Sequence, residues 1–309
     1  MKRGWTILFV VLIMYLSGCA PREFHTETSG DANSAYEVED CVLPTKDGQH
    51  IVLENDHTIE SYRAHYGLGT CYSLRGNQTV VLFFMDDDES SWSADEIVAF
   101  TNERILPALE FLQNQAERWE VELSFTVKRY STPLSDGLDM VYTGSVIKDL
   151  SISGSTKDLP HQVAAIFGFD TELALLAALM EEYETDSVIP LMFINKNGTA
   201  YARNQLSEQI VDHMEHAVIF ADPLQAPIGS WRYMDRRSAT TAHEILHLFG
   251  AEDYYLDADR MQLAEKYYIR DVMLLDSFRL SQLNIDKATA YYIGWTDEIP
   301  EVCYDENWY

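Results

Sequence analysis

The sequence predicts an α+β fold, because strand-like and helix-like segments follow one another along the chain. Thr79–Phe84 is a continuous run of β-branched, aliphatic and aromatic residues, which is typical of a buried strand. The segment Ser93-Ala94-Asp95-Glu96 has the pattern of a capping box and predicts the start of a long helix that runs to about Trp119. A second apolar run, Val188–Ile194, predicts another buried strand.

Further elements are expected between these segments. Pro107 should kink the long helix, because proline has no backbone N–H to donate. Val121–Val127 alternates apolar and polar residues and predicts a half-buried strand. We expect a strand and loops over 137–154, and one or two helices over Leu159–Tyr183 with an interruption near Gly168.

The C-terminal half continues the alternation. The pair Asn197-Gly198 favours a tight turn, so we expect Val188–Ile194 to form a hairpin with Thr199–Ala202. Ala217–Ala221 predicts a further short strand, and an amphipathic helix follows it.

That last helix contains the most informative segment of the chain, His243-Glu244-Ile245-Leu246-His247-Leu248-Phe249-Gly250-Ala251-Glu252-Asp253. Histidines four residues apart lie on one helix face, so both imidazoles can reach a single metal ion. Glu244 is rotated by roughly 100° from His243, which lets it act on a water without binding the metal itself. The alternative is an ordinary amphipathic helix whose His and Glu side chains face solvent.

A third ligand is expected shortly after this helix. Gly250 comes where a helix often ends in a left-handed residue, and such a turn would bring Asp253 back towards the metal. Glu265, eighteen residues after His247, is an alternative third ligand, although the glycine spacing favours Asp253. Three protein ligands with an open position are typical of a catalytic Zn²⁺ site rather than a structural one.

The pattern H-E-x-x-H-x-x-G-x-x-D resembles the signature of the metzincin metallopeptidases. Aspartate at the third ligand position resembles the snapalysin-like branch of secreted bacterial peptidases. The resemblance covers Ser238–Trp295 and implies a zincin-like domain with a mixed twisted sheet, a backing helix and an active-site helix. It also implies a methionine-containing turn beneath the metal, for which Met273 is the candidate. No tyrosine follows Met273 within two residues, so a tyrosine ligand from that turn is not expected.

The same resemblance implies how a substrate binds. In that family an edge strand of the sheet pairs with an extended peptide, and the 188–202 hairpin is our candidate for this edge. Asp271 is a candidate to accept a hydrogen bond from a ligand imidazole. Tyr254 or Tyr255 is a candidate donor to an oxyanion. His213 and His216 lie three residues apart, but a second metal site there is the less favoured interpretation.

The N-terminus predicts export and membrane attachment. Lys2 and Arg3 precede ten apolar residues, Ile7–Leu16, which suit a signal peptide and fall short of the ~20 residues that span a bilayer. Leu16-Ser17-Gly18-Cys19 resembles the lipobox of bacterial lipoproteins, in which the cysteine is lipidated. We therefore expect a protein anchored to a bacterial membrane through Cys19 and facing outside the cytoplasm. A plain secretory peptide with an incidental Cys19 is the alternative.

The predicted domains are a signal peptide over 1–18, a flexible polar tether over 19–45 and a peptidase domain over 46–309 with a helical insertion around 158–183. The chain has a net charge of −28, and removal of the signal peptide takes away two basic residues, leaving −30. This charge argues against nucleic acid as a partner. We expect a monomer.

The number and spacing of the cysteines do not determine which disulfides form. With Cys19 lipidated, Cys41, Cys71 and Cys303 remain, which is an odd number. A Cys41–Cys71 or a Cys71–Cys303 disulfide suits an oxidising compartment, and three reduced thiols are an equal alternative.

These observations together predict a zinc-dependent endopeptidase that acts on a peptide or protein substrate, with Glu244 as general base. A zinc-containing binding or scaffold lipoprotein without turnover is the alternative from another class. The presence of Glu244 argues against it, because a structural zinc site needs no general base. A hydrolase of non-peptide amides or esters is also compatible with the motif, and the sequence does not indicate the substrate.

Overall fold

The computed structural model divides the chain into two units, Met1–Glu39 and Asp40–Tyr309, and every described residue lies in the second. The structure describes residues 42–44, 50–52, 69–130, 140–142, 147–150, 156–204, 213–221, 231–275, 278–305 and 308. The expected signal peptide, Cys19, Cys41 and most of the expected tether lie outside these ranges. Val42–Pro44, near the end of the expected tether over 19–45, form β1, which pairs antiparallel with β2 (His50–Val52).

A seven-stranded mixed sheet forms the centre of the second unit. Its strands lie in the order β5-β4-β3-β7-β9-β8, with β6 paired to the end of β3. All pairings are parallel except that between β8 and β9. The bounds are β3 Gly76–Asp87, β4 Leu123–Tyr130, β5 Met140–Tyr142, β6 Ile147–Leu150, β7 Val188–Ile194, β8 Tyr201–Arg203 and β9 His216–Phe220. The α+β class with a mixed sheet is therefore as predicted.

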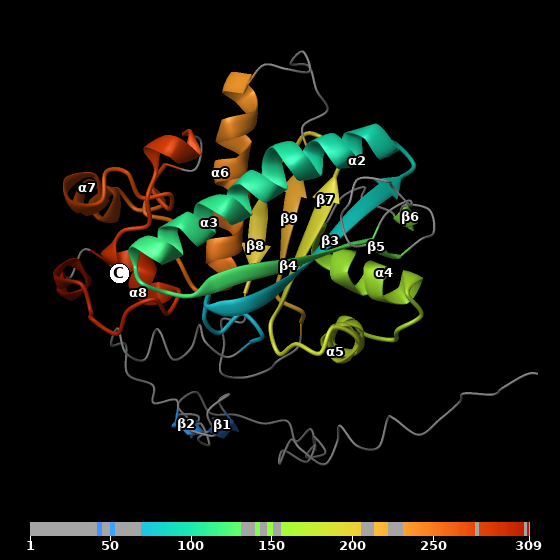
Figure 1. Ribbon diagram of the computed structural model, residues 1–309, viewed down its shortest axis with the longest axis horizontal. Helices are drawn as coiled ribbons and strands as arrows, with labels where there is room; N and C mark the ends of the chain where they lie inside the picture. Colours follow the sequence, from blue (N-terminus) through green and yellow to red (C-terminus); the bar gives the residue numbers. More distant parts are fainter. Residues whose placement is uncertain are drawn as a thin grey trace, which may run out of the picture. The chain divides into compact units, whose positions relative to one another are not determined.

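Helices cover both faces of this sheet (Figure 1). Successive side chains of a strand point to opposite faces, and β3 divides accordingly. Val80, Leu82 and Phe84 join the core under α2 (Ala94–Phe100), α3 (Leu106–Arg118) and α6 (Trp231–Leu248). The intervening residues, Val81, Phe83 and Met85, join the core under α4 (Leu159–Ile166) and α5 (Glu172–Glu182). A strand covered on both faces needs the unbroken apolar sequence that β3 shows.

The long helix begins as the sequence predicts. Ser93 caps it, because its side chain accepts from the Glu96 amide while the Glu96 carboxylate accepts from the Ser93 amide at 2.8 Å. The helical run continues to Arg118, but Thr101–Ile105 forms a π-helical turn between α2 and α3. Pro107 is the second residue after this turn, and its missing N–H leaves the preceding turn free to widen.

The predicted 188–202 hairpin is wrong. β7 lies between β3 and β9 and is parallel to both, while β8 pairs antiparallel with β9. All seven residues of β7 are buried, because helices cover both faces of this central strand. The strand at the end of the sheet is β8, which is short and only half-buried. The sheet therefore does have an antiparallel edge strand, but it is Tyr201–Arg203.

Other boundaries differ by a few residues. The strand predicted at Val121–Val127 is β4, which starts later because Glu120, in a left-handed conformation with φ of 56°, ends the preceding turn. The expected strand within 137–154 is two short strands, β5 and β6. The helical segment 159–183 is two helices, and Gly168 with φ of 82° separates them as predicted.

The chain after α6 adds α7 (Ala258–Tyr267) and α8 (Lys287–Tyr292). Short 3-10 turns lie at Leu280–Gln282 and Glu301–Tyr304, and a third, Thr156–Asp158, comes before α4. Trp308 is buried, with its ring centroid 4.9 Å from that of Tyr254. Within the described ranges, no helix has the length and apolar character needed to cross a bilayer.

Two cysteines lie in the described part of the chain, and both are buried free thiols. The Sγ of Cys71 contacts the Val188 carbonyl, whereas that of Cys303 lies 3.9 Å from the Tyr292 hydroxyl. Neither of the disulfides considered for Cys71 therefore forms. Burial raises the pKa of the Cys71 thiol well above its usual value, and the nearby Glu215 carboxylate adds to this effect.

Candidate metal centre

The helix α6 places His243, Glu244 and His247 within its last two turns. Gly250 then ends the helix with φ of 95°. The Gly250 amide donates to the His247 carbonyl at 3.0 Å and the Ala251 amide to the Leu246 carbonyl at 3.1 Å, which is the bond pattern of a Schellman motif. This turn reverses the chain, as the position of the glycine predicts.

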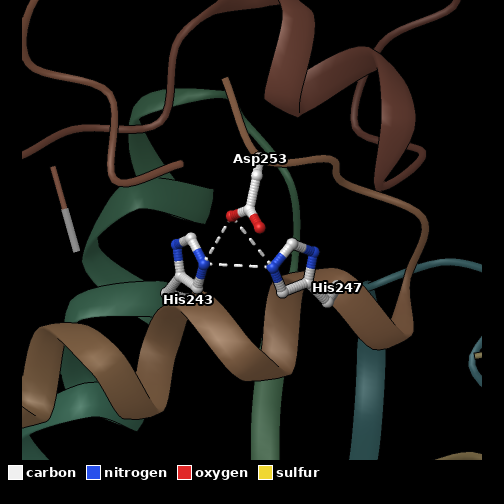
Figure 2. Close-up of side chains that lie close together, drawn as sticks. All are labelled: His243, His247 and Asp253. Atoms are coloured by element: carbon white, nitrogen blue, oxygen red, sulfur yellow. Dashed lines mark hydrogen bonds and ion pairs between the residues drawn. The ribbon is translucent and has the colours of Figure 1, made fainter. Parts of the chain in front are cut away.

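The reversal brings Asp253 to the two histidines (Figure 2). The Nε2 atoms of His243 and His247 are 3.0 Å apart. The Oδ1 atom of Asp253 lies 2.9 Å from Nε2 of His243 and 3.2 Å from Nε2 of His247. Among the described residues, these three form the one group of His, Cys, Asp or Glu side chains placed to share a metal ion.

In each imidazole, Nε2 faces Asp253 and Nδ1 contacts a backbone carbonyl on the opposite side of the ring. Nδ1 of His243 lies 3.1 Å from the Val272 carbonyl, and Nδ1 of His247 lies 2.6 Å from the Ala251 carbonyl. A carbonyl can only accept, so each Nδ1 carries a proton and each Nε2 is left to offer its lone pair to a metal ion.

Three acceptor atoms therefore converge on one point, and acceptors this close repel one another without a cation between them. Two imidazole nitrogens and one carboxylate oxygen are also the donor set that Zn²⁺ prefers in catalytic sites. Without a metal, a proton on Nε2 takes the place of that cation: burial acts to raise the pKa of the Asp253 carboxyl, but hydrogen bonds from the two imidazoles outweigh it and hold this pKa well below the usual value. The residues present thus fit a divalent zinc ion.

Glu244 lies on the same helix between the two histidines. It is 5% exposed, and its carboxylate is not part of the converging group. This is the arrangement that the helical spacing predicts for a residue that would act on a water rather than bind the metal.

Met273 is fully buried and lies in a tight turn that begins at Asp271. The Met273 carbonyl accepts from the Tyr254 amide at 3.2 Å, next to Asp253. The expectation that Asp271 bonds a ligand imidazole is wrong, because its oxygens accept from Met273, Asp286 and Thr289 instead. The neighbouring Val272 carbonyl makes that contact.

Other candidates lie elsewhere. Glu265 is exposed on α7 and outside the converging group, so the structure does not bring it to the histidines. Nδ1 of His216 lies 2.7 Å from the Met214 carbonyl, and burial lowers the pKa of His216 to about 4. Nε2 of His213 lies 3.0 Å from the Asn204 carbonyl. Neither histidine belongs to a metal-binding group in the described part of the chain.

The structure separates the two tyrosine candidates. Tyr254 is fully buried, with its hydroxyl 2.7 Å from the Thr289 hydroxyl. Tyr255 is 40% exposed and its ring stacks on His243, with centroids 6.1 Å apart. Asn204 is a site residue that the sequence did not indicate: its side-chain amide donates to the His247 carbonyl at 2.9 Å and links the end of β8 to α6.

Comparison with protein-family models finds no match for this chain, and comparison with curated protein sequences finds none either.

Proposed function

We propose that this protein is a zinc-dependent endopeptidase of the metzincin type, held at a bacterial membrane through a lipidated Cys19. The observation that carries the proposal is the convergence of three lone-pair atoms from His243, His247 and Asp253, in which a backbone carbonyl orients each imidazole. The N-terminal part of the proposal rests on the lipobox-like sequence before Cys19.

The arrangement of elements supports a zincin-like fold. The helix α3 and the helix α6 share one core on the same face of the sheet, as a backing helix and an active-site helix would. The edge strand β8 is antiparallel to its neighbour and packs against α6. The turn with Met273 is hydrogen-bonded to the segment that carries Asp253, through the Met273 carbonyl and the Tyr254 amide.

Zinc, when bound by His243, His247 and Asp253, supplies a Lewis acid that polarises the scissile carbonyl and lowers the pKa of a water. The Glu244 carboxylate takes a proton from the attacking water and delivers it to the departing amine. Tyr255 stands beside His243 on the exposed side, where its hydroxyl is the candidate donor to the developing oxyanion.

The edge strand would bind the substrate. An extended peptide can add to the outer edge of β8 through backbone hydrogen bonds. The bond from Asn204 to the His247 carbonyl ties the end of β8 to the turn of α6 that holds a proposed ligand. A peptide on this strand would therefore have a defined position relative to Glu244.

The test is zinc content of the purified protein together with cleavage of casein, with and without a chelator. We expect one zinc per chain and chelator-sensitive cleavage. Glu244→Gln should retain zinc and lose about 100-fold or more in turnover, because it removes the general base. Wild-type protein without zinc after reconstitution would refute the proposal, and zinc without cleavage of any peptide would leave a binding protein.

A further inference from the structure

A buried carboxylate, Asp271, lies outside the converging group but joins the segments that hold it. The side chain is fully buried. Its Oδ1 accepts from the Met273 amide at 2.8 Å and from the Thr289 hydroxyl at 2.9 Å, while its Oδ2 accepts from the Asp286 amide at 2.7 Å. A buried carboxylate is costly unless it is hydrogen-bonded, and this one has three donors.

The turn that Asp271 begins has two contacts with the proposed metal centre. The Val272 carbonyl orients His243 through Nδ1 at 3.1 Å. The Met273 carbonyl accepts from the Tyr254 amide, directly after Asp253. One bond of the carboxylate, to the Met273 amide, lies between these two carbonyls along the chain.

We propose that Asp271 is a positioning residue for the metal centre: its carboxylate holds the turn so that the Val272 carbonyl orients His243 and the Met273 carbonyl holds the loop of Asp253. This rests on the proposed function, since it assumes that those side chains bind zinc. The hydrogen bonds of Asp271 go to Met273, Asp286 and Thr289 rather than to any of the three proposed ligands, so it acts through the backbone of the turn.

The same carboxylate provides an internal control. The Thr289 hydroxyl donates to the same Oδ1 atom and also lies 2.7 Å from the Tyr254 hydroxyl, but it does not belong to the turn. Thr289→Val removes this bond and leaves the bond to the Met273 amide. If Asp271 acts only as general support, Thr289→Val should weaken zinc binding in proportion to its loss of stability.

Asp271→Asn separates the hydrogen bond that holds the turn from the hydrogen bond to the Asp286 amide. Two donors meet Oδ1 and one meets Oδ2, so the carbonyl of Asp271→Asn should face Met273 and Thr289. Its NH₂ group then faces the Asp286 amide, and that bond is lost. Asp271→Asn should therefore keep the turn while lowering stability, whereas Asp271→Ala loses the hydrogen bonds at both carboxylate oxygens.

The experiment measures the zinc dissociation constant of the full chain by chelator competition and the melting temperature of the metal-free protein. The absorption spectrum of the Co²⁺-substituted protein reports the geometry of the ligands. We expect Asp271→Ala to weaken zinc binding about 10- to 100-fold, the usual range when a group that orients a metal ligand is removed. Asp271→Asn should recover most of this affinity, and Thr289→Val should retain it with a lower melting temperature.

Zinc affinity and a Co²⁺ spectrum unchanged in Asp271→Ala would overturn the inference and leave the proposed function intact. Weakened zinc binding in Thr289→Val, matched to its lower melting temperature, would also overturn it, and this readout serves even if Asp271→Ala does not fold. A wild-type protein that binds no zinc would overturn the proposed function and this inference together.

Discussion

Replacing Gly250 with alanine tests how the end of the active-site helix builds the proposed metal centre. Gly250 has φ of 95°, in the left-handed region that glycine occupies without strain. A Cβ in this region costs about 1–2 kcal/mol. The smaller conformational freedom of alanine in the unfolded chain returns about 0.4–1 kcal/mol. Gly250→Ala should therefore lower the free energy of unfolding by about 1 kcal/mol.

The substitution should also weaken zinc binding. The Ala251 carbonyl, which orients His247 at 2.6 Å, follows Gly250 directly, and Asp253 comes two residues later. A change in the backbone at Gly250 thus moves the orienting group of one proposed ligand and the chain that carries another. We expect zinc affinity to fall by roughly 10-fold or more, as for loss of other groups that orient ligands.

Gly168 provides a matched control. It ends α4 with φ of 82°, and a Cβ there would meet no atom within 4 Å. Its amide donates to the Ala165 carbonyl and the Phe169 amide to the Ala164 carbonyl, which is the same bond pattern as at Gly250. Gly168→Ala should lose a similar free energy of unfolding without any change in zinc affinity.

The assays are thermal unfolding of the metal-free proteins and chelator competition for zinc. A loss of 1 kcal/mol corresponds to about 2–4 °C in melting temperature for a domain of this size. The reasoning is refuted if Gly250→Ala and Gly168→Ala have equal zinc affinities, because the turn at Gly250 would then have no specific part in the site.

Three further predictions follow from the site. Asp253→Asn should abolish zinc retention during dialysis whereas Glu265→Gln should not, and the opposite result would make Glu265 the ligand. Tyr255→Phe should lower kcat about 100-fold with little change in KM, if its hydroxyl donates to an oxyanion; an unchanged kcat would exclude that role. Burial raises the pKa of Asp271 to about 7, above the ~3.9 of an unfolded aspartate. The folded state binds the extra proton between these values, so this contribution to stability is present at pH 4 and lost as the pH rises to 7. The difference in unfolding free energy between metal-free wild type and Asp271→Asn should decline over that interval, and a constant difference would contradict the assignment.

The sequence by itself predicted the features that depend on near neighbours in the chain. The spacing of His243, Glu244 and His247 follows from helix geometry, and the left-handed turn at Gly250 follows from the lack of a Cβ. The capping box at Ser93 and the helix break at Gly168 are local in the same sense. The placement of Asp253 beside the histidines agrees with this reasoning, and zinc itself stays a prediction.

The tertiary structure alone decided which strands pair in the sheet and which distant segment contacts the proposed ligands. The apolar run of β7 indicates burial but does not name its partners, so the sequence favoured a hairpin where the strand in fact lies between β3 and β9. The orientation of His243 depends on a backbone carbonyl 29 residues away, at Val272, and a carbonyl carries no side-chain signal in the sequence. Long-range pairing of this kind depends on how the whole core packs, which local spacing and propensity do not determine.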